Sequence, residues 1–498
     1  MPNHLWDALF ARHEGSGAPF LHLPDRATWT HGEFTARAAR LASVLAGRGL
    51  LPGDRVAVQV AKSPDALVLY AACVRGGFAF LPLNTAYTPN ELDYFVSDAE
   101  AALLVCDPGM LETLRPVADG AGARIATLAE LGAEADEGAP APATDRDADD
   151  LAAILYTSGT TGRSKGAMLS HANLASNAEA LAGAWRFTAD DVLIHALPIF
   201  HTHGLFVATN VTLAAGGSLI FQPKFDPGAI LAAMPRATAL MGVPTFYTRL
   251  LDHPALTREA VEGMRLFVSG SAPLLAETHR AFEARTGHRI LERYGMTETN
   301  MNASNPYEGE RRPGTVGPAL PGVEIRVADA DGTPVPPGEV GTVEVRGPNV
   351  FGGYWRMPEK TAEEMRPDGF FITGDLGTLS EDGYLTIVGR AKDLVISGGY
   401  NIYPKEVELL LDEMPGVLES AVIGVPHPDM GEGVVGVLVP ETGAALDADA
   451  VMGALEGQIA RFKQPRRIEI VDELPRNTMG KVQKNALRKR FGDTFAKG

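Results

Sequence analysis

Hydrophobic and polar positions follow two different periods in the first third of the chain. Residues 34–45 and 63–74 carry apolar side chains every three or four positions, which predicts two amphipathic helices. Residues 55–60 and 78–82 are short and mostly apolar, as is typical of buried strands. Because helices of this length alternate with short strands, the pattern predicts layered α/β structure with largely parallel sheets.

The pattern changes after residue 312. Residues 313–388 show period-two alternation interrupted by Asp-Gly and Pro-Pro-Gly turns, which is typical of antiparallel strands. Residues 404–411 then predict a helix and residues 419–425 a strand. We therefore expect a large N-terminal domain at residues 1–388, with a β-rich subdomain at about 313–388. A hinge at residues 389–392 then leads into a small mobile α+β C-terminal domain at residues 393–498.

Composition narrows the class of protein. The chain has 498 residues, of which 45% are hydrophobic and 21% charged, as in soluble globular proteins of two or three domains. Its net charge of -18 argues against nucleic acid or an anionic membrane as a partner, so an anionic substrate needs local cations. Cys73 and Cys106 lie in apolar segments, which implies a reducing compartment and no disulfide framework. Neither a signal peptide nor a membrane-spanning run is found, so we expect a cytoplasmic protein.

A glycine-rich polar segment follows an apolar run at residues 151–155. Residues 156–166 read YTSGTTGRSKG. Glycines let backbone N–H groups approach a polyphosphate, hydroxyls donate to its oxygens, and Lys165 supplies charge. The spacing differs from a Walker loop, because Lys165 lies three residues after Gly162 and precedes a glycine. A solvated surface loop is the alternative. The candidate phosphate ligands are Thr157, Ser158, Gly159, Thr160, Thr161, Gly162 and Lys165.

Two further segments combine small polar residues with one carboxylate. Residues 293–300, RYGMTETN, follow a predicted strand at 288–292. Because α/β sheets bind ligands at strand ends, Thr297 is a candidate donor to a phosphate and Glu298 a candidate Mg²⁺ ligand. Asp375 lies in a Thr-Gly-Asp sequence between apolar residues, where its carboxylate can accept both hydroxyls of a ribose. A polar turn is the alternative for each segment taken alone.

Residues 389–404, GRAKDLVISGGYNIYP, and 474–484, LPRNTMGKVQK, complete a set of five ordered motifs. The set resembles the adenylate-forming enzymes, which include acyl-CoA synthetases, peptide-synthetase adenylation domains and firefly-type luciferases, and it covers essentially the whole chain. The resemblance implies ATP, Mg²⁺ and coenzyme A as ligands. A carboxylic acid attacks the α-phosphorus of ATP, pyrophosphate leaves, and a thiol then attacks the acyl-adenylate.

The same resemblance assigns roles to individual residues. Lys481, Thr297 and His201 receive catalytic roles, and Thr161 joins Glu298 as a metal ligand. Lys392 becomes the hinge about which the small domain swings, because Lys481 has no task in thioester formation. The implied ligands of ATP or AMP outside the phosphate loop are Ser271, Ala272, Pro273, Glu292, Arg293, Tyr294, Gly295, Met296, Thr297, Asp375, Arg390 and Lys481. Those of coenzyme A are Ser397, Gly398, Gly399 and Tyr400.

Two other patterns are rejected. Residues 431–436 satisfy G-x-G-x-x-G, but they lead into a strand-like segment, whereas a dinucleotide fingerprint precedes a helix. His201 and His203 suggest a metal site, but no further Cys/His cluster accompanies them.

The identity of the acid is predicted from Arg249. Residues 241–251, MGVPTFYTRLL, predict a helix that begins at Pro244 and carries Arg249 one turn after Thr245. An inward-pointing guanidinium needs a partner, because an unpaired buried charge costs several kcal/mol. We expect a second carboxylate of the substrate to be that partner. A side chain that faces solvent or a structural acid is the alternative.

If His201 and Ser269 flank Arg249, the remaining space fits a three-carbon diacid best. Within the family, three segments resemble the malonyl-CoA synthetases in particular, namely residues 196–204, 243–249 and 293–305. This implies malonate as the acid, with methylmalonate as a second candidate. The alternatives are an acyl-CoA synthetase for another short-chain or aromatic acid, a carrier-protein-loading adenylation enzyme, and a non-catalytic ATP-binding regulator. The sequence leaves the oligomeric state open.

Overall fold

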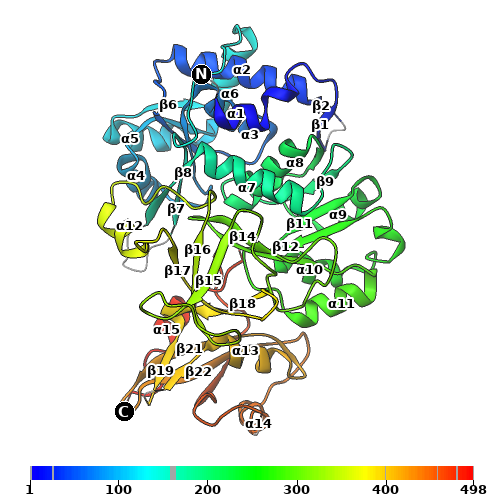
Figure 1. Cartoon of the computed structure of the whole chain (residues 1–498), viewed down its shortest axis with the longest axis vertical. Helices are drawn as coiled ribbons and strands as arrows, with labels where there is room; N and C mark the ends of the chain where they lie inside the picture. Colours follow the sequence, from blue (N-terminus) through cyan, green and yellow to red (C-terminus); the bar gives the residue numbers. More distant parts are fainter. Residues whose placement is uncertain are drawn as a thin grey trace.

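The computed structural model describes residues 3–24, 27–157, 164–398, 400–456, 458–477 and 480–496. Stacked layers of sheet and helix fill the upper part of the molecule, and the C-terminal residues form a separate lobe at its lower end (Figure 1). The predicted fold class, layered α/β sheets with a β-rich part and a small α+β part, is confirmed.

The helices lie mostly before residue 300. They are α1 (His4–Leu9), α2 (His31–Gly47), α3 (Pro64–Gly76), α4 (Pro89–Asp98), α5 (Leu111–Ala121), α6 (Leu128–Glu137), α7 (His171–Ala184), α8 (Asn210–Ala215), α9 (Pro227–Ala233), α10 (Pro244–Leu251), α11 (Ala276–Thr286), α12 (Pro358–Glu364), α13 (Pro404–Asp412), α14 (Ala448–Ala454) and α15 (Lys484–Phe491). The predicted helices at 34–45 and 63–74 are α2 and α3.

Local signals set the bounds of these two helices. Thr30 and Glu33 form a capping box at the start of α2, in which each side chain accepts a hydrogen bond from the backbone N–H of the other residue. Ser63 caps α3, and Gly77 ends it in the left-handed conformation at φ 72°, which glycine adopts without steric cost. All side chains of α3 from Ala66 onward are buried, because α1, α2 and α6 pack around it.

The first sheet has six strands in the order β6-β5-β3-β4-β7-β8. Their bounds are β3 (Arg55–Gln59), β4 (Ala79–Pro82), β5 (Ala101–Cys106), β6 (Arg124–Thr127), β7 (Leu151–Thr157) and β8 (Lys165–Ser170). All neighbours are parallel except β7 and β8, which form an antiparallel pair. The connection between β7 and β8 is the predicted phosphate segment, of which residues 158–163 lie outside the described part of the chain.

The second sheet has eight strands in the order β14-β13-β12-β11-β9-β10-β1-β2. Their bounds are β1 (Pro19–His22), β2 (Thr28–Thr30), β9 (Val192–His195), β10 (Ser218–Phe221), β11 (Ala239–Gly242), β12 (Leu266–Ser269), β13 (Leu291–Met296) and β14 (Asn300–Ser304). From β1 to β13 the neighbours are parallel, so the carboxyl ends of β9, β11 and β12 meet at one edge. Ligands of such sheets bind at this edge.

The strand predicted at residues 288–292 lies further along the chain than expected. Strand β13 runs from Leu291 to Met296, so Tyr294, Gly295 and Met296 belong to the strand instead of following it. The reason is the antiparallel pairing of β13 with β14, which extends the strand past the parallel part of the sheet.

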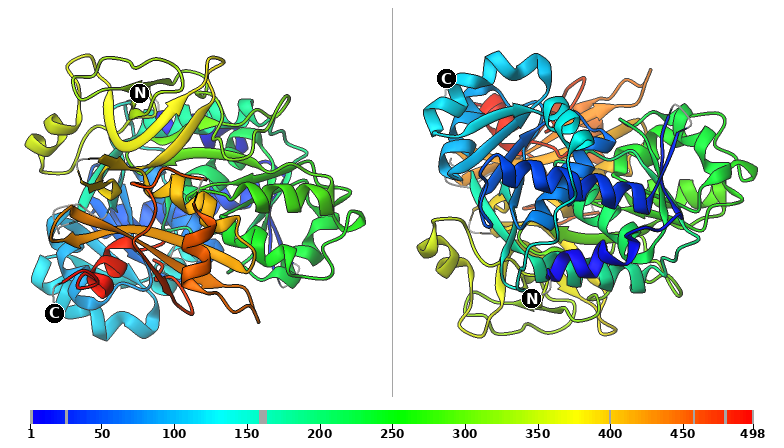
Figure 2. Two further views of the ribbon diagram at one scale, coloured as in Figure 1. Left: turned by 90° about the horizontal axis from the view of Figure 1, so that it is seen from below. Right: turned by 90° about the horizontal axis from the view of Figure 1, so that it is seen from above.

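The β-rich segment forms a four-stranded antiparallel sheet, β15 (Glu324–Ala328), β16 (Gly341–Arg346), β17 (Phe371–Leu379) and β18 (Leu385–Arg390). The C-terminal sheet comprises β19 (Val395–Ser397), β20 (Tyr400–Ile402), β21 (Val417–His427), β22 (Gly431–Pro440) and β23 (Arg467–Ile470). The rejected G-x-G-x-x-G pattern opens β22 and is followed by no helix there. Views from both ends show the C-terminal sheet on the underside of the large layers (Figure 2).

The proposed hinge lies between these two sheets. Residues 391–393 form a short turn of helix, η6 (Ala391–Asp393), directly after β18. Two hydrophobic clusters contain only residues after this turn, so the C-terminal lobe has core contacts of its own. The division into domains at residues 389–392 stays a prediction.

Candidate active site

Three residues predicted to bind nucleotide meet where β13, β17 and β18 approach each other. Asp375 and Arg390 are cross-strand neighbours, and Arg390 Nε lies 2.6 Å from Asp375 Oδ1. The hydroxyl of Tyr294 donates to the other oxygen, Asp375 Oδ2, at 2.5 Å. Burial and the Asp375 charge raise the pKa of Tyr294, so the phenol stays protonated and donates. The carboxylate of Asp375 is thereby fixed in orientation.

Lys481 reaches the same place from the C-terminal lobe. Desolvation by the surrounding protein lowers its pKa, Arg390 lowers it further, and Asp375 raises it, which places the ammonium group within electrostatic reach of that pair. The preceding Gly480 has φ 75°, and a Cβ at this position would lie 3.8 Å from the hydroxyl of Thr245 on α10. The C-terminal loop therefore contacts the large domain at the start of α10. Lys481 is exposed as a whole residue, while its ammonium group is partly desolvated.

Glu298 forms a second, buried centre. Its Oε1 accepts a hydrogen bond from the hydroxyl of Thr157 at 3.3 Å and lies 3.0 Å from the hydroxyl oxygen of Tyr354. Burial raises the pKa of Glu298, and the side chain is only 5% exposed. Thr297, next to it, is half-buried. The structure thus brings Thr157 from the first sheet and Glu298 from the second to the same point.

The donor set at Glu298 fits Mg²⁺ that arrives with a nucleotide. Within the described residues, no group of three His, Cys, Asp or Glu side chains forms a metal site. One carboxylate with neighbouring hydroxyls suits Mg²⁺, which keeps several waters and binds substrate phosphates. Thr161, the other predicted metal ligand, lies outside the described residues.

Lys165 lies at the far end of the phosphate segment. Its ammonium group is 3.1 Å from Glu364 Oε1 and 3.9 Å from the centre of the Tyr354 ring. The predicted ligands Ser158, Gly159, Thr160 and Gly162 lie outside the described residues, as Thr161 does. Thr157 and Lys165 flank the segment. Thr157 donates to Glu298, and Lys165 lies over the ring of Tyr354.

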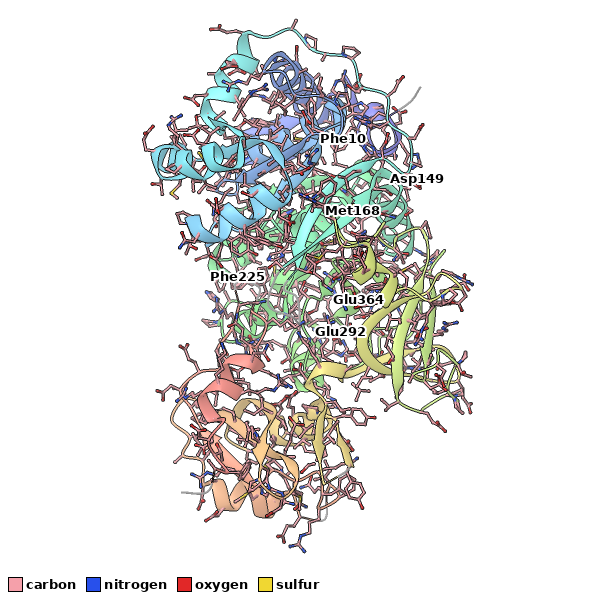
Figure 3. The ribbon with its side chains drawn as sticks, turned by 90° about the vertical axis from the view of Figure 1, so that its left-hand side faces the viewer. Phe10, Asp149, Met168, Phe225, Glu292 and Glu364 are labelled. Carbon is pink, nitrogen blue, oxygen red and sulfur yellow. The ribbon has the colours of Figure 1, made fainter. Side chains whose placement is uncertain are left out.

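Glu292 and the loop after β12 complete the predicted nucleotide ligands. Glu292 is buried, accepts a hydrogen bond from the backbone N–H of Leu274 at 3.0 Å, and burial raises its pKa to about 7. Ser271 has φ 71°, an uncommon value for a non-glycine residue, and its hydroxyl lies 3.1 Å from His203 Nδ1. Ala272 and Pro273 follow in the same loop. Figure 3 shows Glu292 and Glu364 near the middle of the molecule.

Arg249 is exposed and not buried as expected, and its part in binding the acid stays a prediction. Helix α10 buries Phe246, Tyr247 and Leu250, and Arg249 lies beside that face and is exposed. Its guanidinium is 6.0 Å from the centre of the Phe225 ring, and no carboxylate of the described residues lies within 4.0 Å of it. An exposed charge keeps its hydration, so the electrostatic reason for an inward partner does not apply to this residue.

The buried cation is Arg293 instead. Its side chain is 3% exposed, and its Nε and one Nη have no hydrogen-bond partner among the described residues. Burial lowers its pKa to about 9, so the guanidinium is still charged near neutral pH. A Cβ at Gly270 would lie 2.4 Å from the guanidinium carbon, so glycine at this position makes room for the group.

Four other buried polar atoms, at residues 201–203 and 269, also lack partners among the described residues, and the charge of Arg293 acts on one of these residues, His203. The four atoms are His201 Nε2, Thr202 Oγ1, His203 Nε2 and Ser269 Oγ. Burial lowers the pKa of His201 to about 4, and burial together with Arg293 lowers the pKa of His203, so both imidazoles are neutral at pH 7. Buried polar groups without partners are rare in native proteins. A polar ligand would satisfy such atoms, and the guanidinium of Arg293 is the charged group among them.

Sequence reasoning assigned Arg293 to the nucleotide and did not identify it as a buried cation without partners. The available signal was an arginine at the end of a predicted strand, directly before the Tyr-Gly-Met-Thr-Glu motif. His201 and Ser269, predicted beside the acid, each carry a buried polar atom without a partner among the described residues, and their place at the acid stays a prediction.

The predicted coenzyme A ligands lie on the C-terminal lobe. Ser397 is buried beside Met430, and the N–H of Gly398 donates to the Met430 carbonyl at 2.9 Å. Tyr400 is 57% exposed and stacks on Phe462 with 4.6 Å between ring centres. Gly399 lies outside the described residues, and Lys392 is exposed in η6.

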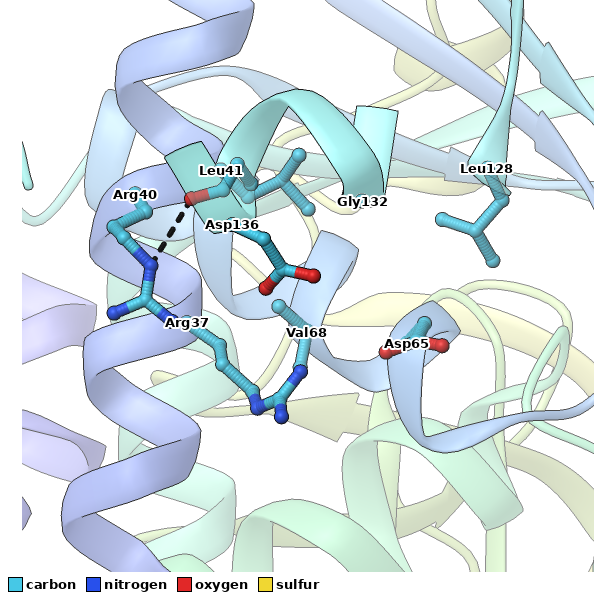
Figure 4. A pocket seen from close by; sticks show the side chains of 9 residues that line it. Arg37, Arg40, Leu41, Asp65, Val68, Leu128, Gly132 and Asp136 are labelled. Carbon is cyan, nitrogen blue, oxygen red and sulfur yellow. Dashed lines mark hydrogen bonds between the residues drawn. The ribbon is translucent and has the colours of Figure 1, made fainter. Parts of the chain in front are cut away.

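A small cavity lies far from these residues, among α2, α3 and α6 (Figure 4). Its volume of about 30 Å³ suits a water molecule, and Arg37, Asp65 and Asp136 line it. Beside it Arg40 Nε donates to the carbonyl of Ala135 at 3.0 Å. We assign the cavity no part in the active site. Among the described residues, no helix is both long and apolar enough to cross a membrane.

Comparison with known proteins gives a consistent picture. A family model described as AMP-binding enzyme matches residues 10–355, and one described as AMP-binding enzyme C-terminal domain matches residues 406–481. The chain is 39% identical to a feruloyl-CoA synthase of an Amycolatopsis species, over 93% of this chain and 94% of the relative. It is 33% identical to a malonate–CoA ligase of Arabidopsis thaliana, over 93% and 85%. The crystal structure of ATP-bound MatB from Rhodopseudomonas palustris superposes with a TM-score of 0.97, at 59% identity over 99% of this chain and 100% of that one.

The two-lobed fold and the site between its parts define an adenylate-forming enzyme. The chain belongs to the AMP-binding enzyme family, and within it to the AMP-forming acid–thiol ligases.

Proposed function

We propose that the protein joins malonate to coenzyme A with ATP, through malonyl-AMP, and releases AMP and pyrophosphate. The observation that carries the proposal is the buried guanidinium of Arg293 with two nitrogen atoms that have no partner among the described residues. An unpaired buried charge costs several kcal/mol, and a carboxylate removes that cost by accepting two parallel hydrogen bonds from the planar group. A diacid supplies one carboxylate for Arg293 and a second for the reaction with ATP.

The surroundings of Arg293 favour a small, polar acid. His201, His203 and Ser269 offer donors and acceptors, and the two imidazoles are neutral, so the pocket holds one positive charge for one carboxylate. A site built to pair a carboxylate rejects analogues that lack it, because its polar groups are then left unmatched. This favours malonate over acetate and over the aromatic acid of a feruloyl-CoA synthase. Methylmalonate is the second candidate.

Arg249 has a proposed place at the entrance. It lies one helical turn after Thr245, which contacts the Gly480 loop, so both residues share the side of α10 that faces the C-terminal lobe. An exposed cation there attracts a dianion toward a protein whose net charge is -18.

For adenylation, the chain's residues bring two anions together and stabilise charge on the α-phosphate. We assign Asp375 and Arg390 to the ribose, Lys481, Thr297 and Lys165 to phosphate oxygens, and Glu298 to Mg²⁺. Bound Mg²⁺ supplies further neutralisation of the phosphates. Removal of one such donor typically lowers the rate about 10²–10³-fold.

For thioester formation, we propose that the C-terminal domain turns about Lys392. Ser397, Gly398, Gly399 and Tyr400 then line the path of the pantetheine thiol, and the exposed Tyr400 ring becomes covered. Cys73 and Cys106 are free and buried, which fits a reducing, cytoplasmic location.

Pyrophosphate release from ATP tests the function. We expect malonate to support it, coenzyme A to be consumed in equal amount, and acetate and ferulate to be poor substrates. Equal activity with acetate or ferulate would contradict the proposed acid while leaving the ligase reaction itself in place.

A further inference from the structure

The pairing of Lys165 has a feature that the proposed reaction does not use. Glu364, the last residue of α12, holds Lys165 with N–O distances of 3.1 and 3.4 Å. Lys165 and Glu364 are 12% and 22% exposed, so the pair is largely shielded from water. The two residues are 199 positions apart in the chain. An ion pair in such surroundings is stronger than one on the surface.

The pair lies beside the candidate metal ligand. The hydroxyl of Tyr354 contacts Glu364 Oε2 at 2.6 Å and Glu298 Oε1 at 3.0 Å, and Lys165 lies over the ring of the same tyrosine. A carboxylate is thus placed where the pyrophosphate part of ATP is expected. The ammonium group has three N–H donors, but a carboxylate beside it repels pyrophosphate and shares the charge of Lys165, so pyrophosphate and Glu364 compete for this lysine.

A second lysine makes the exchange possible. Lys360, one turn earlier on α12, lies 3.1 Å from Glu364 Oε1. When Lys165 leaves, Lys360 and Tyr354 remain as partners of Glu364. The carboxylate is therefore not left as an unpaired buried charge, which would be costly.

We propose that Glu364 is an exchangeable counter-ion of Lys165. It holds the lysine while the pyrophosphate site is empty, yields it to ATP, and takes it back when pyrophosphate leaves. Glu364 acts through Lys165, and it is a positioning residue that weakens the retention of pyrophosphate. This inference rests on the proposed function, in which Lys165 binds phosphate.

Calorimetric titration of the full-length, ligand-free protein with magnesium pyrophosphate tests the inference without reference to any acid. Glu364→Gln keeps the size of the side chain and its hydrogen bond from Tyr354 but removes the charge. We expect pyrophosphate to bind about five- to tenfold more tightly to this variant, in line with the loss of a partly buried ion pair.

Glu363→Gln is the matched control. Glu363 is the preceding residue, pairs with Lys360 at 2.9 Å, and has no contact with Lys165 in the structure. The Glu363→Gln variant loses the same charge as Glu364→Gln. If the local exchange and not the net charge is responsible, its affinity for pyrophosphate should stay within about twofold of that of the wild type. In a Lys165→Gln background, Glu364→Gln should give no gain.

Unchanged or weaker binding in Glu364→Gln would overturn the inference, as would an equal gain in Glu363→Gln. If the protein used another acid, the proposed substrate would be contradicted, but the expected result of the pyrophosphate titration would not change. The two failures are therefore distinguishable.

Discussion

At the scale of single residues, the acid pocket depends on one guanidinium whose partner is supplied by a ligand. Arg293 is buried with unpartnered N–H groups, whereas the half-buried Arg265 is paired with Asp191 at 2.6 Å. A buried charge that is paired within the protein does not need a ligand to stabilise it. One that is left open lowers the stability of the empty protein and becomes favourable when the ligand binds.

Arg293→Gln should therefore separate binding from stability. We expect kcat/KM for malonate to fall about 10²-fold or more, because a buried charge pair with the substrate is lost, while the KM for ATP stays within about twofold. The thermal midpoint of the empty protein should not fall. Pyrophosphate release and thermal unfolding measure these quantities. Arg289→Gln, which removes an exposed arginine paired with Glu283, is the control. Equal losses toward malonate and ATP would contradict the assignment.

Glu292 gives a stability that depends on pH. Burial raises its pKa from 4.5 to about 7, so the folded protein binds this proton more tightly than the unfolded chain does. Its stabilising contribution is thus fully present below about pH 4.5 and is lost as the pH rises toward 7, by about 1.4 kcal/mol per pKa unit.

Glu292→Gln keeps an acceptor for the N–H of Leu274 and cannot ionise. We expect the thermal midpoint of the wild type to fall relative to that of this variant between pH 5 and pH 8, measured without nucleotide. Parallel pH profiles of the two proteins would contradict the assigned cause.

At the scale of elements, the turn between β13 and β14 fixes the motif that carries Thr297 and Glu298. A Cβ at Gly295 would lie 1.9 Å from the Asn300 carbonyl oxygen, a distance that real structures do not allow. The strands approach so closely because they are paired there with a register shift.

Gly295→Ala should separate the two strands and displace Glu298. We expect a lower thermal midpoint and a loss of activity of about 10²-fold, since misplacement of about 1 Å at a reacting group has that effect. Gly183→Ala in α7 is the control, because a Cβ there meets no atom within 4 Å and alanine favours the helix. Similar unfolding curves for Gly295→Ala and wild type would contradict the close packing.

Periodicity predicted the helices at 34–45 and 63–74 to within a few residues, and Pro244 marked the start of α10, because such signals act on near neighbours in the sequence. The orientation of Arg249 could not be predicted in this way. A helix pattern shows which residues share a face, but the face that becomes buried is decided by distant segments such as the one with Phe225. The pair of Lys165 and Glu364 depends likewise on two segments that meet only in the folded chain.

At the scale of the whole molecule, one lysine links the two lobes. Lys481 belongs to the C-terminal lobe and lies within electrostatic reach of Asp375 and Arg390 of the large domain. It is useful for the first half-reaction and is expected to leave for the second.

Lys481→Ala should abolish adenylation and leave thioester formation from supplied malonyl-AMP within about threefold of wild type, because only the first step develops charge at the α-phosphate. Pyrophosphate release reports the first step, and thioester formation reports the second. Lys489→Ala removes an exposed lysine of α15 and is the control. Equal loss of both steps would contradict this division of labour.

The electrostatic state of the pocket around Arg293 has a consequence for a cell whose interior becomes acidic. The pKa of about 4 for His201 and of about 9 for Arg293 both lie well outside the range from pH 6 to pH 8, and the pKa of His203 is lowered as well. The receptor for the far carboxylate therefore keeps a charge of one throughout that range. A fall in pH from 8 to 6 would therefore leave the charge on these protein groups unaltered.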